Sequence, residues 1–150
     1  MEWKLEVVVV PVSDVDRSKL FYEEQAGFTV DHDTVLRDGV RVVQLTPPGS
    51  PCSIVVGKGL IDAPPGSVKG LQLVVPDIER AHADLVARGV EVSPVQHFVA
   101  GGRVDGHGEA WNSFVFFNDP DGNGWAVQEA PREARREALR EARREAPRAA

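Results

Sequence analysis

Residues suited to acid–base chemistry are concentrated in the second half of the sequence. His107 lies between Gly106 and Gly108, and an imidazole in such a loop could titrate near neutral pH and serve as an acid or a base. Glu129 ends an apolar segment and offers a carboxylate for the same purpose. We therefore predict His107 and Glu129 as candidate catalytic residues. The alternative for His107 is an ordinary solvated loop histidine.

A second group of residues could bind a ligand without reacting with it. Gln44, Gln72 and Gln128 each lie in an apolar segment, and an amide both donates and accepts hydrogen bonds, which suits carbonyl, phenol or amide groups. Each amide could instead face solvent or satisfy a neighbouring backbone group. The glycine-rich loop 97–110 is long enough to suggest a function. That loop and the segment after it add four candidates: Arg103, Trp111, Phe114 and Phe116. Core packing is the alternative for the aromatic residues.

Hydrophobic periodicity and turn residues predict the elements that must position these side chains. The first set has the order strand, helix, strand, strand, strand: 5–12, 13–27, 28–36, 40–46 and 52–56. We expect Ser13 to cap the first helix and Asp77 to cap the second. The second set repeats that order: 71–75, 77–89, 90–96, 113–117 and 125–129.

Short sequence echoes support an internal repeat. DVDR at 14–17 matches DIER at 77–80, and VVQ at 42–44 matches AVQ at 126–128. We therefore divide the chain into a first βαβββ module at 1–57, a linker at 58–68 and a second module at 69–131. An Arg/Glu/Ala-rich tail at 132–150 contains REARREA twice and favours helix. This charged C-terminal helix could lie free in solvent or dock on the body or on a second subunit.

Three segments carry a resemblance to a known family: PVSDVDRSKLFYE at 11–23, GLQLVVPDIERA at 70–81 and SFVFFNDPDGNGWAVQEAP at 113–131. Together with the repeat, they resemble the vicinal oxygen chelate superfamily of glyoxalases, bleomycin-resistance proteins and extradiol dioxygenases. The resemblance implies an α+β fold, in which two βαβββ modules form a half-open barrel with a pocket on its concave faces. Modules of this family pair within one chain or between two chains, so a homodimer is one expected arrangement.

Metal-using members of this family hold a divalent ion with four inward His, Glu or Gln side chains. The corresponding positions here are Val7, Gln44, Gln72 and Gln128. A valine cannot coordinate, and neutral amides are weak ligands beside imidazole and carboxylate. We therefore predict a polar pocket floor and no metal ligands. The alternative is a divalent metal, recruited if a one-residue register slip turned Glu6 or Glu129 inward.

Composition limits the other classes of function. The formal net charge is −6, and the tail holds seven Arg and four Glu, so residues 1–131 hold 10 basic and 19 acidic residues. An acidic body argues against nucleic-acid binding. Cys52 is the only cysteine, which excludes an intrachain disulfide. The sequence shows neither a signal-peptide pattern nor an apolar segment of about 20 residues, so we expect a cytoplasmic protein that does not contact membrane.

These observations favour a metal-independent protein that binds a small organic molecule. It would sequester an antibiotic or natural product, or act as an isomerase or lyase without a metal. The competing hypothesis is a divalent-metal-dependent enzyme of the glyoxalase or dioxygenase type, in which a Lewis acid activates paired oxygens. A third hypothesis is an interaction module that recruits a partner through its helical tail.

Overall fold

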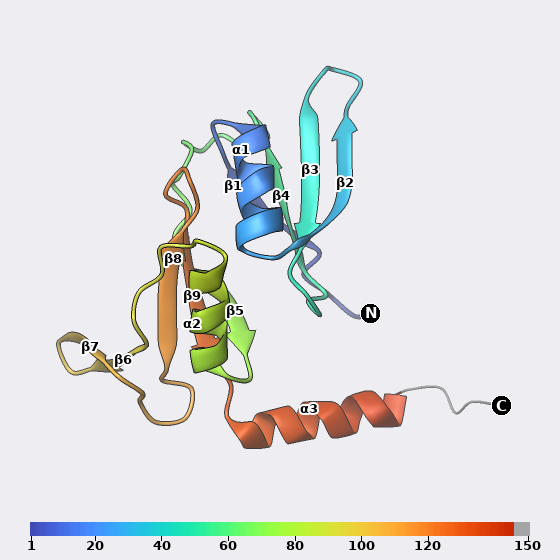
Figure 1. Cartoon of the computed structure of the whole chain (residues 1–150). Helices are drawn as coiled ribbons and strands as arrows, with labels where there is room; N and C mark the ends of the chain where they lie inside the picture. Colours follow the sequence, from blue (N-terminus) through green and yellow to red (C-terminus); the bar gives the residue numbers. More distant parts are fainter. Residues whose placement is uncertain (146–150) are drawn as a thin grey trace.

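The computed structural model of the chain describes residues 1–145, apart from the side chains of Ala134, Arg135 and Ala138. Two separate sheets carry the fold (Figure 1). The N-terminal sheet has the order β1-β4-β3-β2, with β1 parallel to β4 and the other pairs antiparallel. Its elements are β1 (Val7–Pro11), α1 (Val15–Leu20), the π-helical turn η1 (Phe21–Gln25), β2 (Thr29–Val35), β3 (Arg41–Thr46) and β4 (Ser53–Gly57).

The C-terminal sheet repeats this plan with one addition. Its order is β5-β9-β8-β6-β7, and β5 is parallel to β9 as β1 is to β4. Its elements are β5 (Leu71–Val75), α2 (Ile78–Ala87), β6 (Gln96–Val99), β7 (Gly102–Asp105), β8 (Phe114–Asn118) and β9 (Gly124–Glu129). The sheets are not closed, so the α+β architecture of two half-open βαβββ units is confirmed.

The segment between α2 and β8 differs from the prediction. The predicted strand 90–96 is not formed: Val92 makes only an isolated bridge to Phe117, and Gln96 instead begins β6. The predicted loop 97–110 contains the two-stranded hairpin of β6 and β7. Ala100 and Gly101 form its turn, and Gly101 and the first residue of β7, Gly102, have positive φ angles of 89° and 152°. Such angles suit glycine, so the glycines that suggested a loop serve a hairpin turn.

Aspartates begin both helices. Asp14 Oδ1 accepts a hydrogen bond from Arg17 N at 3.0 Å, and Asp77 Oδ1 accepts one from Arg80 N at 3.0 Å. The expected cap at Ser13 is wrong, because the Ser13 hydroxyl instead donates to Asp121 Oδ1. The echo of DVDR and DIER therefore marks the same structural position in the two modules.

The two modules share one hydrophobic core between their helix-facing sides. Aromatic rings of the first module pack on rings of the second: Tyr22 and Phe28 lie 5.8 and 5.6 Å from Trp125, centroid to centroid, and Phe21 lies 6.2 Å from Phe117. Because these faces meet, the opposite face of each sheet points away from the common core. We call these two surfaces the open faces.

Helix α3 (Arg132–Glu145) follows β9 and leads away from the sheets (Figure 1). The structure thus places a helix over most of the predicted tail, while residues 146–150 lie outside the described part of the chain. No helix in the described part is both long and apolar enough to cross a bilayer.

Candidate functional site

Strand register brings most of the predicted ligand-binding residues to the open face of the C-terminal sheet. Gln72 on β5 pairs with Ala126 on β9, and Ala126 pairs with Phe116 on β8. Two residues further along β9, Gln128 pairs with Phe114. Because side chains alternate along a strand and paired residues share a face, these five side chains lie on the same side of the sheet.

The hairpin extends this surface with a further ring and a cation. Phe98 on β6 lies 5.2 Å from Phe114 and 6.2 Å from Phe116, in edge-to-face contacts, while Phe114 and Phe116 stack at 5.9 Å. Arg103 on β7 lies over the Phe116 ring, with its guanidinium carbon 4.1 Å from the ring centroid. These three rings and Arg103 are called the aromatic platform below.

Sequence reasoning missed Phe98, although a signal was present. Gln96 and Phe98 alternate with His97 and Val99 at the period of a strand, and Gln96 pairs with Phe114. The neighbouring glycines suggested a loop and hid this alternation.

The glutamines of the C-terminal sheet form a hydrogen-bond chain beside the platform. Gln72 Nε2 donates to Gln128 Oε1 at 2.7 Å, and Gln128 Nε2 donates to the backbone carbonyl of Trp111 at 2.6 Å. Trp111 has a φ of 63°, the only positive φ outside glycine among residues 1–145. Such backbone strain clusters at functional sites, and its indole is 48% exposed.

Gln44 lies elsewhere, on the open face of the N-terminal sheet, where it pairs with Val55 and His32. Within one chain, therefore, the structure does not bring Gln44 to Gln72 and Gln128. The supposed equivalence of VVQ at 42–44 and AVQ at 126–128 is also wrong. In topology β3 corresponds to β8 and β4 corresponds to β9, so the counterpart of Gln44 lies on β8, where Phe116 is found.

The candidate catalytic residues lie on the opposite, helix-facing side of the C-terminal sheet. Glu129 Oε2 accepts a 2.8 Å hydrogen bond from the backbone nitrogen of Ile78, at the start of α2. His107 Nε2 lies 2.7 Å from Glu79 Oε1. Both line a polar cavity of about 820 Å³ that Arg132 and Arg136 of α3 also border. The structure thus brings His107 and Glu129 to one cavity, separate from the aromatic platform.

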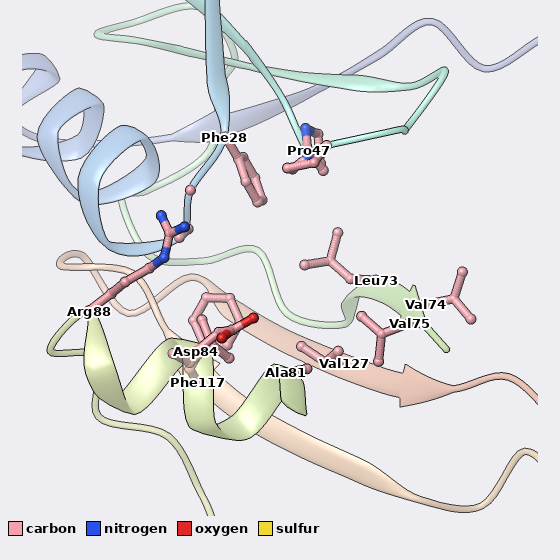
Figure 2. Close-up of a pocket in the computed structure, with 14 residues that line it drawn as sticks. Phe28, Pro47, Leu73, Val74, Val75, Ala81, Asp84, Arg88, Phe117 and Val127 are labelled. Atoms are coloured by element: carbon pink, nitrogen blue, oxygen red, sulfur yellow. The ribbon is translucent and has the colours of Figure 1, made fainter. Parts of the chain in front are cut away.

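A second hollow lies between the modules (Figure 2). This apolar pocket of about 270 Å³ lies between Phe28 and Pro47 of the first module and Leu73, Val75 and Phe117 of the second. Its charged residues are Asp84 of α2 and Arg88, which caps the C-terminus of that helix. Sequence reasoning gave no signal for it, because its walls come from segments that are apolar for ordinary core packing.

The sequence profile of the Glyoxalase/Bleomycin resistance protein/Dioxygenase superfamily matches residues 4–127. The chain belongs to this superfamily. The resemblance carried by the DPDG turn and the repeated helix openings is therefore confirmed.

Solved structures of the superfamily resemble the chain along most of its length. TnmS3, described as an antibiotic binding protein from Streptomyces sp. CB03234, is 30% identical with a TM-score of 0.71, covering 87% of this chain and 98% of TnmS3. A glyoxalase/bleomycin resistance protein from the same organism is 32% identical with a TM-score of 0.67, at coverages of 83% and 99%. A superfamily member from Sphaerobacter thermophilus DSM 20745 is 26% identical with a TM-score of 0.68, at coverages of 85% and 98%. No curated protein matched the sequence.

The superfamily includes metal enzymes, and the residues present do not fit a divalent ion. Of the four residues expected at its ligand positions, Val7 cannot coordinate, Gln44 lies on the other sheet, and the amides of Gln72 and Gln128 are already bonded to each other. Among the described residues, no group of three or more His, Cys, Asp or Glu side chains could hold a metal. Neutral amides with a valine cannot balance the charge of a dication.

Proposed function

We propose that this protein binds a small aromatic organic molecule on the open face of its C-terminal sheet, without a metal. The observation that carries the proposal is the convergence there of the aromatic platform, which includes the cation Arg103, and the amide chain. Stacking surfaces beside a few fixed polar groups are typical of small-molecule sites. Arg103 offers N–H groups to an oxygen of the ligand, and Gln72 offers an amide.

Sequestration of an antibiotic or natural product fits this site better than catalysis. The relative TnmS3, at 30% identity, is described as an antibiotic binding protein. His107 and Glu129, the predicted acid–base residues, lie behind the sheet and bond to Glu79 and Ile78. A bound molecule on the platform is therefore separated from both groups by the sheet, which disfavours an isomerase or lyase that uses them.

A homodimer is part of the proposal, because the open faces are incomplete in one chain. Trp3 and Leu5 are 90% and 69% exposed. They continue the alternation of Val7 and Val9 along the chain. Val9 pairs with Val55, which also pairs with Gln44, so this row lies on the same face as Gln44. A second copy that laid its N-terminal sheet over the platform would cover this apolar row. It would also supply Gln44 to the ligand.

The acidic body supports a function without nucleic acid: residues 1–131 hold 10 basic and 19 acidic residues. We also propose a cytoplasmic location, which suits a chain whose single cysteine cannot form an intrachain disulfide.

The hypothesis of an interaction module that recruits a partner through its tail receives less support, since α3 offers Leu139 as its only large apolar residue.

The direct test is equilibrium binding of planar aromatic antibiotics, with bleomycin included, followed by tryptophan fluorescence in wild type, Arg103→Ala and Phe116→Ala. Arg37→Ala is the matched control, because it removes an exposed arginine from the turn between β2 and β3. Each platform variant should weaken binding by about tenfold or more, on the scale of a cation–π contact and a lost ring. Unchanged affinity in both platform variants would move the site elsewhere, with the pocket of Figure 2 the next candidate.

A further inference from the structure

The amide chain beside the platform has a fixed direction. Its last acceptor is the carbonyl oxygen of Trp111, and a backbone carbonyl has no hydrogen to donate. Gln128 must therefore present its NH₂ group to Trp111 and its oxygen to Gln72. That oxygen in turn requires the NH₂ group of Gln72, which donates at 2.7 Å. Neither amide can flip without losing a hydrogen bond.

The acceptor at the end of the chain is itself held in place. Asn112, next to Trp111, forms two hydrogen bonds with the backbone of Phe98: Phe98 N donates to Asn112 Oδ1 at 2.8 Å, and Asn112 Nδ2 donates to Phe98 O at 3.0 Å. The left-handed backbone of Trp111 costs conformational energy. The Asn112 pair ties this strained turn to the hairpin that carries the platform.

The first amide of the chain has an unused acceptor. Among residues 1–145, no group donates a hydrogen bond to Gln72 Oε1, and Gln72 is exposed on the edge strand β5. The side chain of Arg103 likewise makes no hydrogen bond or ion pair in the described part of the chain, and its one cation–π contact is with the Phe116 ring. One side of the site therefore offers a hydrogen-bond acceptor, and the other offers donors.

Between Gln72 and the Phe116 ring, over which Arg103 lies, the sheet carries only the small side chain of Ala126. Gln72, Ala126 and Phe116 lie in one row across β5, β9 and β8. The backbones of Gln72 and Phe116 are about 10 Å apart, because two inter-strand spacings separate β5 from β8. A fused bicyclic aromatic ring with one substituent at each end spans this distance, and the methyl group of Ala126 leaves room for it against the sheet.

From these contacts we infer that the chain Gln72–Gln128–Trp111 selects an aromatic ligand with a hydrogen-bond donor, a hydroxyl or amino group, at the Gln72 end and an anionic oxygen at the Arg103 end. The inference rests on the proposed function and specifies its ligand. A ligand with a carbonyl or ether oxygen at the Gln72 end would face the lone pairs of Gln72 Oε1. The direction of the chain prevents the amide from turning to accommodate it.

Matched naphthoates test this selection. Binding of 6-hydroxy-2-naphthoate, 6-amino-2-naphthoate and 6-methoxy-2-naphthoate is measured by calorimetry and by the indole N–H signals of the three tryptophans. The hydroxy and amino compounds should bind wild type about tenfold more tightly than the methoxy compound, since an acceptor that the ligand covers without pairing loses about that factor. Gln72→Leu should remove the preference and retain binding of the methoxy compound. Gln128→Leu, which cannot accept from Gln72 and so frees its amide to turn, should reduce this preference.

The outcomes separate the two proposals. Equal affinity for all three compounds in wild type, with the Trp111 signal shifted, would overturn the selection rule and leave aromatic binding at the platform intact. Persistence of the preference in Gln72→Leu would also overturn it. If no naphthoate shifts the Trp111 signal, the aromatic site itself fails and the inference fails with it. Circular dichroism of each variant confirms that it is folded, which is expected because Gln72 is exposed.

Discussion

The hydroxyl of Tyr22 donates a 2.8 Å hydrogen bond to Asp119 Oδ2, joining the first helical segment to the β8–β9 turn across 97 positions of sequence. Trp125 Nε1 donates to the same Tyr22 oxygen at 3.0 Å. Asn123 Nδ2 donates to Asp119 and to the carbonyl of Pro11. These buried groups bind the two modules together, so the network supports the surface on which the platform is built.

Replacing Tyr22 with phenylalanine should destabilise the fold by about 2 kcal/mol, because it leaves the Trp125 N–H unpaired and removes a donor from a buried carboxylate. Urea unfolding followed by circular dichroism measures the change. Thr34→Val is the control: it removes a hydroxyl at an exposed position and should change the free energy of unfolding by less than about 0.5 kcal/mol. A loss no larger than that of the control would show that the network is not stabilising.

Alkaline pH should unfold the protein through the same residue. Burial, followed by the charge of Asp119, raises the pKa of Tyr22 well above its ordinary value. The unfolded chain releases this proton near pH 10 and the folded chain retains it, so the stabilisation is present below about pH 10 and is lost as the pH rises further.

Tyr22 is the only tyrosine, so tyrosinate absorbance near 295 nm reports it alone. We expect this signal to appear only together with the loss of helical circular dichroism. Tyrosinate formed near pH 10 in a protein that still shows native circular dichroism would contradict the burial of this hydroxyl.

Much of this fold could be predicted from the sequence because local signals agreed with one another. The cap at Asp77 and the DPDG turn are short-range features whose chemistry depends on adjacent residues. The strand at Leu71–Val75 was predicted with its observed bounds. Ser13 failed as a cap because its partner, Asp121, lies 108 positions away, and no local pattern encodes such a contact.

The site was harder to predict than the fold, for the same reason. The alternation of Phe114, Phe116, Ala126 and Gln128 places them on a common face once the pairing of β8 with β9 is known. The separation of Gln44 depends instead on how the two modules pack, which rests on contacts such as Tyr22 with Trp125. The hairpin that carries Phe98 was hidden by its own turn glycines.

Removing the exposed apolar row at the N-terminus should weaken self-association. In sedimentation velocity, wild type is expected to behave as a dimer, and the double variant Trp3→Ser, Leu5→Ser should shift toward monomer, because burial of large apolar side chains drives association. Leu139→Ser is the matched control, since Leu139 is 54% exposed on α3. A monomeric wild type with full ligand affinity would contradict the proposed completion of the site by a second copy.

Protein purified without a chelating tag should contain only trace metal after loading with zinc, nickel, manganese or iron(II), because neutral amides hold dications weakly. Elemental analysis provides the measurement. Gln25→Ala is the control for loss of an amide elsewhere. Near-stoichiometric metal in wild type and in this control, but not in Gln72→Ala, would support a metal-dependent enzyme instead.

Variants of Glu129 distinguish a structural role for this residue from the catalytic role that the sequence predicts. Its carboxylate accepts the N–H of Ile78 in the first turn of α2, so Glu129→Ala should cost about 1 kcal/mol of stability, the scale of a lost helix cap. Glu129→Gln should recover most of that loss, because an amide oxygen accepts the same hydrogen bond. Glu91→Ala, at an exposed position, controls for the removal of a carboxylate.

Urea unfolding and naphthoate binding are measured in parallel. We expect the stability of the Glu129 variants to change and their affinity for the naphthoates to stay constant. A variant Glu129→Gln that is as stable as wild type and yet loses turnover of a bound compound would restore the catalytic role, since the hydrogen bond survives and only the acid–base group is gone.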